Sequence, residues 1–277
     1  MSRYEQADIK WVKTVTGWFC VLPDFITIGA QKCGTRSLYH YLVQHPCIVL
    51  PQKKEVHFFD LNFDKGGLWY RAHFARIWSR WLARAGGRRL VTGESTPYYM
   101  FHPRVPERVF GTIPQVKLIA LLRNPVDRAY SHYQSRVRKG LERLSFEEAI
   151  QKEAERLKEE TERMSRDENY RSLIHQYHSY LSRSVYADQL KEWLSFFPRR
   201  QILALRSENF FADTSGTLEI IFRFLNLPAF EIRNLRPRNQ SDYDTMEAGT
   251  RGQLLEYFAP HNQRLYRLLG EDFGWDR

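Results

Sequence analysis

The stretch from Phe25 to Leu38 constrains the fold of this chain more than any other. Its first four residues, Phe25–Ile28, are apolar without alternation, which predicts a short buried strand closed by Gly29. From Thr35 onward apolar residues recur at helical spacing, so a helix is predicted to begin there. A strand, a glycine-bearing turn and a helix N-terminus together favour an anion site, because backbone N–H groups and the positive end of the helix dipole meet there.

The turn also carries side chains that suit a phosphate group. Lys32 adds a positive charge, and Thr35 and Ser37 add hydroxyl donors. The turn is not a Walker A loop, in which lysine directly follows the second glycine, because Lys32 precedes Gly34 by two positions. Phosphate binding is therefore the prediction, and an ordinary strand-to-helix connection is the alternative.

Composition sets the outer limits of the interpretation. The chain has 277 residues, enough for one large domain or two small ones, and 43% hydrophobic and 14% aromatic content excludes a disordered protein. Its net charge of +10 permits an acidic partner: a nucleotide, a sulfated or phosphorylated glycan, nucleic acid or a membrane surface. Charge alone does not choose among these partners.

Cysteine usage and hydropathy indicate a cytoplasmic protein of a reducing compartment. The three cysteines, Cys20, Cys33 and Cys47, form no Cys-x-x-Cys pair, which argues against a disulfide scaffold or a zinc site. No uncharged apolar run approaches the ~18 residues that span a bilayer. Pro23 and Asp24 interrupt the apolar part of the first 25 residues, so no secretory signal is predicted.

A second polar segment, Lys53–Asp60, places an acid and a histidine two residues apart. In an extended segment Glu55 and His57 would project to the same side. Apolar neighbours would partly desolvate Glu55 and raise its pKa toward the range of a general base, with Lys53 or Lys54 opposing that shift. The alternative is a charged edge strand that contains a histidine by chance.

A second buried strand, Val116–Leu122, also ends in a basic residue. Arg123 follows it, and Pro125 suits the first turn of a helix that carries Ser131. Ligands of open α/β sheets bind at the carboxyl ends of the strands, so the two strand ends could hold two phosphate groups of one nucleotide. Alternatively, Arg123 and Ser131 only cap and solvate the helix.

The remaining periodicity predicts further helices and strands around these two segments. Ser145 and Glu148 form a capping box, and the charged stretch that follows is predicted to be a mostly solvated helix. We expect short helices covering the core at 66–85, strands near 48–51, 91–95 and 202–206, helices at 217–227 and 247–269 with a kink or break at Pro260, and an irregular stretch at 231–253.

Taken in order, several segments resemble the sulfotransferases that use 3′-phosphoadenosine 5′-phosphosulfate (PAPS), in particular the heparan sulfate 3-O- and N-sulfotransferase branch. The resemblance covers nearly the whole chain. It includes the family's 5′-phosphosulfate loop, its catalytic segment, its acceptor-lining loop, its 3′-phosphate motif and its later helices. The corresponding segments are 28–38, 55–60, 94–99, 122–131, 183–198, 256–258 and 273–275.

The resemblance implies an α/β fold with an open parallel sheet flanked by helices, a P-loop-like nucleotide-binding fold. It implies a single domain over 1–277, with a peripheral arm at 1–24 and a helical insertion at 140–180 near the acceptor cleft. The implied reaction is sulfuryl transfer from PAPS to a hydroxyl or, less readily, an amine, leaving adenosine 3′,5′-bisphosphate (PAP). No metal is called for, since the cations are side chains.

The resemblance also assigns roles to residues. Lys32 would stabilise the leaving group, Glu55 would act as general base, and His57 would orient the acceptor or assist Glu55. The acceptor would contact Glu55, His57, Phe58, Thr96 and Tyr98. The nucleotide would contact Lys32, Cys33, Gly34, Thr35, Arg36, Ser37, Arg123, Ser131 and Arg238.

The chain departs from the heparan enzymes in its C-terminal region. It has no cysteine after Cys47 to form their disulfide, and Arg236–Ser241 resembles their Lys-Gly-Arg run only loosely. The membrane anchor of the Golgi members is also missing, which indicates a soluble, bacterial relative. Its acceptor would be a natural product, a carrier-bound intermediate or a glycolipid, with a polyanionic glycan still in play.

Three other functions compete with this interpretation. An ATP-dependent P-loop phosphotransferase needs Ser or Thr directly after the loop lysine, but Cys33 follows Lys32. A non-catalytic nucleotide- or glycan-binding module would keep the fold without the chemistry. A nucleic-acid binder is less favoured, because the aromatic residues occupy core positions. The expected partners are the sulfate donor and a small-molecule or glycan acceptor.

Overall fold

The computed structural model describes residues 15–51, 53–236 and 244–276. They form a five-stranded sheet in the order β2-β3-β1-β4-β5, and every ladder between these strands is parallel. The strands are β1 (Phe25–Gly29), β2 (Ile48–Val49), β3 (Val91–Ser95), β4 (Lys117–Leu122) and β5 (Ile202–Arg206). The predicted open parallel sheet is confirmed.

Strand β1 is the centre of the sheet, with two strands on each side, and its residues are buried throughout. From β1 the chain passes first to β2 and β3 on one side and then to β4 and β5 on the other. This reversal leaves a crevice at the carboxyl end of β1, where open α/β sheets bind their ligands. The segments after β1, β3 and β4 therefore converge on one edge.

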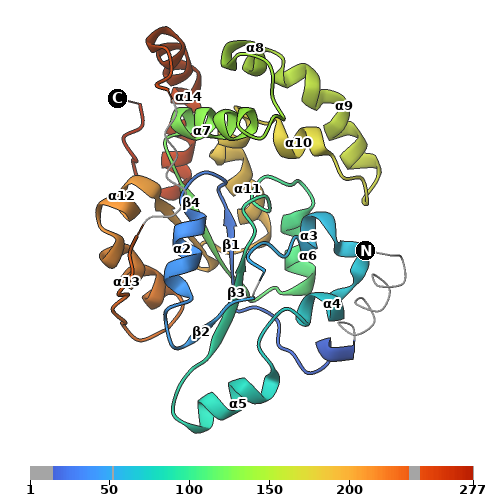
Figure 1. The fold of residues 1–277 in the computed structure, drawn as a ribbon, viewed down its shortest axis with the longest axis vertical. Helices are drawn as coiled ribbons and strands as arrows, with labels where there is room; N and C mark the ends of the chain where they lie inside the picture. Colours follow the sequence, from blue (N-terminus) through green and yellow to red (C-terminus); the bar gives the residue numbers. More distant parts are fainter. Residues whose placement is uncertain (1–14, 52, 237–243, 277) are drawn as a thin grey trace.

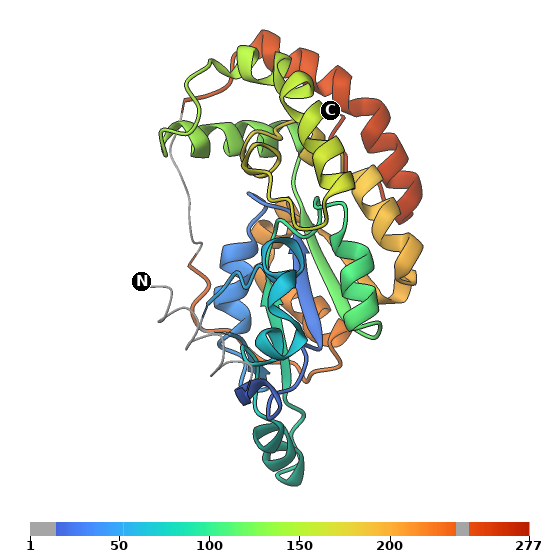
Figure 2. The ribbon, with the colours of Figure 1, turned by 90° about the vertical axis from the view of Figure 1, so that its right-hand side faces the viewer.

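Helices cover both faces of the sheet. On one face lie α2 (Thr35–Leu42), α12 (Ser207–Ala212) and α13 (Thr214–Phe224), and on the other α6 (Val105–Thr112) and α11 (Tyr186–Phe196) (Figures 1 and 2). The rings of Tyr41 and Phe210 join α2 to α12, with centroids 5.8 Å apart. The two helical layers shield a core whose strand residues are almost completely buried.

A second group of helices lies beyond the carboxyl edge of the sheet (Figure 1). It consists of α7 (Pro125–Val137), α8 (Phe146–Gln151), α9 (Glu153–Arg166), α10 (Leu173–Tyr177) and α14 (Ala248–Leu269). The predicted capping box is confirmed: Ser145 Oγ accepts from Glu148 N at 3.2 Å, and Glu148 Oε2 accepts from Ser145 N at 2.9 Å. The predicted single helix after it is interrupted at Lys152, which separates α8 from α9.

The remaining elements are short. They are α3 (Phe58–Leu61), η1 (Phe63–Lys65), α4 (Gly67–Arg71), α5 (Ile77–Ala85), η2 (Ser182–Ser184) and η3 (Arg199–Gln201). The expectation that helices at 66–85 cover the core is wrong for α5. No residue of α5 is buried, and Trp81 is 67% exposed. Of the kink or break expected at Pro260, the break is wrong, because α14 continues through this residue.

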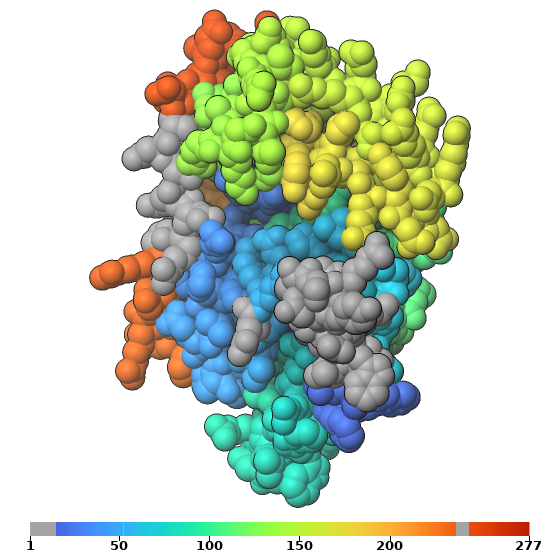
Figure 3. Space-filling view, turned by 45° about the vertical axis from the view of Figure 1, so that its right-hand side comes forward, coloured from blue at the N-terminus to red at the C-terminus, as the bar shows by residue number. Residues whose placement is uncertain are grey.

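A groove separates the two groups of helices. Figure 3 shows the molecular surface hollowed between residues 125–180, in green to yellow, and the blue α2 with the segment that follows it. The turn after β1 lies at this level of the fold (Figure 1). Among the described residues no helix is both long and apolar enough to cross a bilayer.

Candidate active site

The loop between β1 and α2 has the backbone form that a close anion contact requires. Gly34 caps α2 with φ 94° and contributes no side chain, so α2 begins without a side-chain cap. A Cβ at Gly34 would lie 2.9 Å from the ring of Phe211. Lys32 also has a positive φ, 74°. The loop is therefore held in a tight left-handed conformation, with the first turn of α2 behind it.

Lys32 lies in a strongly positive environment. Burial, followed by the charges of Arg138, Arg136, Arg123 and Lys139, lowers its pKa to about 8. Burial and repulsion both oppose the charged ammonium, and a polyanion bound here would relieve both effects. The loop thus has the electrostatics of a phosphate or sulfate site.

Cys33 takes part in this loop through its backbone. Its thiol is buried, 3.8 Å from the hydroxyl of Tyr186, and burial raises the pKa of the thiol to about 11. The carbonyl of Cys33 accepts a hydrogen bond from Ser207 Oγ at 2.9 Å. A ligand in the loop would therefore meet the backbone of Cys33 rather than its sulfur.

The second strand end reaches the same edge. Arg123 directly follows β4, and its carbonyl accepts from the hydroxyl of Tyr186 at 3.0 Å. Asn124 caps α7, accepting from Val126 N at 3.0 Å. Asn124, and neither Arg123 nor Ser131, caps the helix. That Arg123 and Ser131 contact a phosphate stays a prediction. Ser131 is 4% exposed on α7.

Several buried cationic or imidazole side chains beside this edge keep nitrogen atoms that have no hydrogen-bond partner among the described residues. The four side chains lie on α7 and η2. The atoms are Arg128 Nη1, both ring nitrogens of His132, Arg136 Nε, and Arg183 Nε and Nη2. Buried donors without partners are costly and uncommon in native proteins. A ligand with several anionic groups fits this surplus, so the residues present suit a nucleotide such as PAPS.

Glu55, His57 and Asp60 form a chain of hydrogen bonds in the segment 55–60. His57 Nε2 lies 3.2 Å from Glu55 Oε2, and His57 Nδ1 lies 2.7 Å from Asp60 Oδ2. Asp60 is buried, whereas the Glu55 side chain is 41% exposed. A buried carboxylate therefore orients an imidazole, which in turn orients a carboxylate that remains open to solvent.

The segment differs in two ways from the sequence prediction. It is not extended, because His57 has φ 54° and α3 begins directly after it. The expected rise in the pKa of Glu55 is also wrong. Burial does favour a higher pKa, but the hydrogen bond with His57 and the charge of Lys54, 3.5 Å away, outweigh it, so the pKa is lowered.

His57 shows the opposite balance. Burial favours a lower pKa, but hydrogen bonds to Asp60 and Glu55 outweigh it and raise the pKa of His57 to about 9. His57 is therefore an imidazolium at neutral pH, and Glu55 beside it is ionised. An ionised carboxylate can accept a proton from an acceptor hydroxyl.

The other residues predicted to bind the acceptor lie below the surface. Thr96 is 0% exposed and donates to Glu94 Oε2 at 2.8 Å. Tyr98 is 5% exposed, and its hydroxyl lies 2.8 Å from Nδ1 of His175 on α10. Phe58 is stacked on Tyr70 with centroids 4.4 Å apart. Their contact with an acceptor stays a prediction.

Sequence reasoning missed two members of this site. Asp60 ends the segment 55–60 and has no predicted role, although its spacing from His57 is that of neighbours on one helical turn. Arg183 lies on η2, donates to Gln31 Oε1 at 2.6 Å, and has its guanidinium 4.7 Å from the ring of Tyr98. Arg183 thus contacts both the loop after β1 and the loop after β3. Arg183 and Gln31 are 152 residues apart in the chain, so no local pattern indicates their contact.

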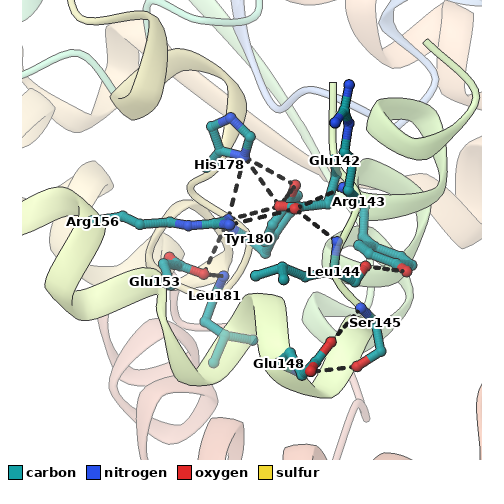
Figure 4. Close-up of polar contacts among 11 residues, drawn as sticks. Glu142, Arg143, Leu144, Ser145, Glu148, Glu153, Arg156, His178, Tyr180 and Leu181 are labelled. Atoms are coloured by element: carbon teal, nitrogen blue, oxygen red, sulfur yellow. Dashed lines mark hydrogen bonds and ion pairs between the residues drawn. The ribbon is translucent and has the colours of Figure 1, made fainter. Parts of the chain in front are cut away.

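The predicted insertion at 140–180 contains a buried polar network (Figure 4). Glu142 accepts from Arg156 at 2.7 Å and from the Tyr180 hydroxyl at 3.0 Å, and lies 3.2 Å from His178 Nδ1. A cavity of about 380 Å³ lies beside it, lined by residues that include Leu141, Arg143 and Ile174. The network fixes how α9 and α10 sit on the fold.

The remaining predicted contacts have less support. Arg36 is exposed at the start of α2. Burial lowers the pKa of Lys54, Glu55 opposes this effect, and the charge of Arg36 adds a smaller lowering. Arg238 lies outside the described residues. Among the residues that the structure describes, no group of three or more His, Cys, Asp or Glu side chains is arranged to hold a metal ion.

A parallel sheet with a cationic loop after its central strand is typical of a nucleotide-binding α/β protein, and the Glu55–His57–Asp60 chain lies on the same fold. Residues 22–250 match the family model described as the sulfotransferase domain. The chain belongs to the sulfotransferase family, whose members are PAPS-dependent enzymes.

Individual relatives agree with this assignment. The membrane-associated sulfotransferase kil1 of Dictyostelium discoideum is 30% identical over 94% of this chain and 68% of its own length. Human heparan sulfate glucosamine 3-O-sulfotransferase 3B1 is 30% identical over 92% of this chain and 65% of its own length. The chain thus spans about two thirds of these curated relatives.

A solved structure shows the same fold. The sulfotransferase from Alicyclobacillus acidocaldarius is 32% identical and superimposes with a TM-score of 0.71, covering 93% of this chain and all of that one. The predicted family and P-loop-like sulfotransferase fold are confirmed.

Proposed function

We propose that this protein transfers a sulfuryl group from PAPS to a hydroxyl group of a carbohydrate, carrier-bound or small-molecule acceptor. One observation carries the proposal: the exposed carboxylate of Glu55 is held by His57 and Asp60 on the same fold as a cationic anion loop. When bound, PAPS supplies an activated sulfuryl group, and PAP is the product. An amine acceptor is the less favoured variant.

One set of side chains would bind the donor, PAPS. Lys32, Thr35 and Ser37 with the first turn of α2 would hold the phosphosulfate, and Arg123 with Ser131 would hold the 3′-phosphate. Arg makes charge-assisted, bidentate contacts with phosphate, and an ammonium provides a compact charge. Lys32 would neutralise the negative charge that develops on the leaving oxygen.

Glu55 would take the proton of the acceptor hydroxyl. Because its pKa is lowered, Glu55 is ionised at neutral pH and needs no prior deprotonation. His57 would keep the carboxylate in place as a charged donor, and Asp60 would keep the ring in place. The three groups act as a unit, so the loss of any one is expected to affect the others.

An anionic acceptor is favoured by charge. The pKa of Lys32 is lowered by the charges of Arg123, of Arg136 near the end of α7, and of Arg138 and Lys139 just after it. This positive charge would attract an anionic acceptor as well as the nucleotide. The relatives named heparan sulfate 3-O-sulfotransferases belong to the same family and act on a polyanionic glycan by name. We also propose that the protein is cytoplasmic, that residues 1–277 form a single domain, and that residues 140–180 lie beside the acceptor.

Calorimetric titration with PAP, beside ATP with magnesium, tests the donor. Tight binding of PAP and none of ATP is expected, followed by PAPS-dependent sulfation of probe acceptors, for which we would use heparan sulfate oligosaccharides and p-nitrophenol. Binding of ATP alone would instead favour a phosphotransferase. Binding of PAP without turnover of any probe would favour a non-catalytic module.

A further inference from the structure

Glu94 is a buried carboxyl group to which the proposed mechanism gives no task. It lies near the end of β3 and is 1% exposed. Its oxygens accept hydrogen bonds from the hydroxyls of Tyr70, Thr96 (2.8 Å) and Tyr99 (3.3 and 3.4 Å). No lysine or arginine in the described ranges forms an ion pair with it, so hydroxyl groups alone compensate its burial.

The hydroxyl of Tyr99 connects this carboxyl group to the catalytic segment. Its oxygen accepts from the backbone N–H of Phe58 at 2.8 Å and of Phe59 at 3.4 Å. These amides open α3, and the first amides of a helix have no partner within the helix. Their usual partner would be the side chain of the N-cap residue, His57, but its ring is bonded to Asp60 and Glu55.

Tyr99 therefore caps α3 from another segment of the chain. The capped turn is strained, because His57 adopts a left-handed backbone that is unfavourable for a residue other than glycine. Asn62 Nδ2 and Arg108 Nη1 hold carbonyls of the same turn, those of His57 and Phe59. The Tyr99 bond holds its amides, directly beside the ring that orients Glu55.

The direction of the hydrogen bonds depends on Glu94. As a carboxylate it accepts from Tyr99, which leaves the lone pairs of the Tyr99 oxygen for the two amides. A protonated Glu94 would donate a proton and compete for them. Burial is the main reason why the pKa of Glu94 is raised to about 7. The hydroxyls of Tyr70 and Thr96 and the charge of His57 oppose the rise, and the charge of Asp60 supports it.

We propose that Glu94 is a positioning residue of the sulfuryl-transfer site, which holds the turn carrying His57, and through it Glu55, by way of the Tyr99 hydroxyl. The inference rests on the proposed function for its catalytic meaning. The link from Glu94 to the turn can be tested without a known acceptor, because the amides of Phe58 and Phe59 and the ring of His57 can be observed directly.

The test compares Glu94→Gln and Tyr99→Phe with Tyr70→Phe at about pH 8, where Glu94 is mainly ionised. Tyr70→Phe is the matched control, since it also removes one hydroxyl from Glu94 but not the bond to the turn. Two quantities are measured in each variant. The first is hydrogen exchange at the Phe58 and Phe59 amides at this pH. The second is the pKa of His57, from a pH titration of its imidazole NMR signal, which is assigned with His57→Gln.

We expect both amides to exchange about tenfold faster or more in Glu94→Gln and Tyr99→Phe. The pKa of His57 should fall from about 9 toward its ordinary 6.5 in both, because the ring loses its fixed distance to Glu55 and Asp60. In Tyr70→Phe both quantities should stay close to wild type. The double variant Glu94→Gln/Tyr99→Phe should change both quantities no more than the single variant with the larger effect. Both substitutions break the same connection, which runs from Glu94 through the Tyr99 hydroxyl to the turn.

Wild-type values in Glu94→Gln would overturn the proposal, as would equal changes in Tyr70→Phe or additive effects in the double variant. If Glu94→Gln does not fold, Tyr99→Phe against Tyr70→Phe decides the same question. A wild-type protein that binds no PAP would overturn the proposed function instead, and these two measurements would still report on the turn.

Discussion

His57 Nε2 lies 3.2 Å from Oε2 of Glu55, and the other ring nitrogen of His57, Nδ1, lies 2.7 Å from Oδ2 of Asp60. The imidazole is thus held from both sides by carboxylates of unequal exposure. The buried one fixes the ring, and the exposed one is left as the group that an acceptor can reach. This arrangement explains why the pKa of His57 rises while that of Glu55 falls.

Replacing Glu55 by Gln should abolish turnover, because the amide cannot accept the acceptor's proton. We expect a loss of about a hundredfold or more, the usual contribution of a general base, with PAP affinity close to wild type. Turnover of a probe acceptor and calorimetry with PAP measure the two effects. The exposed Glu219→Gln on α13 is the control, and a mutant with more than a few per cent of activity would mean that Glu55 is not the base.

Replacing Lys32 by Ala should weaken both PAP binding and chemistry, while Lys158→Ala on the exposed face of α9 should change neither. The pKa of Lys32 is lowered to about 8, so its ammonium is lost as the pH rises through that value. PAP affinity of the wild type should therefore fall above about pH 8. Unchanged affinity in Lys32→Ala would contradict the assignment of the loop.

Asp60→Asn should lower the pKa of His57, because the ring loses its shortest contact with a charged group. The pKa of His57 is about 9 in the folded protein, against an ordinary value of 6.5. Protonated His57 therefore contributes its full stabilisation of the fold below pH 6.5, and this contribution is lost as the pH rises through 9. The contribution is of order 1–3 kcal/mol. Thermal unfolding across that range should show a weaker pH dependence in Asp60→Asn, and an unchanged profile would argue against the ion pair.

Glu142→Gln should destabilise the fold by about 1–3 kcal/mol, because it weakens the bond to Arg156 and the contacts with Tyr180 and His178 (Figure 4). Burial alone would raise the pKa of Glu142, but bonds from Arg156, Leu144 and Tyr180 lower it to about 2. The stabilisation is therefore present above about pH 4.5 and lost as the pH falls toward 2. Denaturant unfolding measures it, with the exposed Glu159→Gln as control.

Local pattern was sufficient for the elements that carry the site. An unbroken apolar run predicted β1 and β4, helical spacing predicted α2 and α7, and the capping box marked the start of α8. Each of these signals depends on neighbours within a few residues of one another. The resemblance added the order of the motifs and with it the family.

Local pattern failed where distant segments decide the structure. The segment around His57 has the composition of a strand, but Tyr99, Asp60 and Asn62 hold it in a left-handed turn. The aromatic residues of α5 suggested a core helix, yet Trp78 and Trp81 are exposed. Hydrophobicity does not say which surface a helix will meet.

The sequence by itself determined that Lys32 sits in a glycine-bearing turn after a buried strand, and that Glu55 and His57 are close in the chain. Only the tertiary structure decided their charge states. Burial and the charges of Arg138, Arg136, Arg123 and Lys139 lower the pKa of Lys32. The left-handed turn brings His57 within hydrogen-bond distance of Asp60 and Glu55, and these contacts raise the pKa of His57 and, with Lys54, lower that of Glu55 against the effect of burial on each. Electrostatic energy depends on distance and solvent exposure, which the order of residues does not specify.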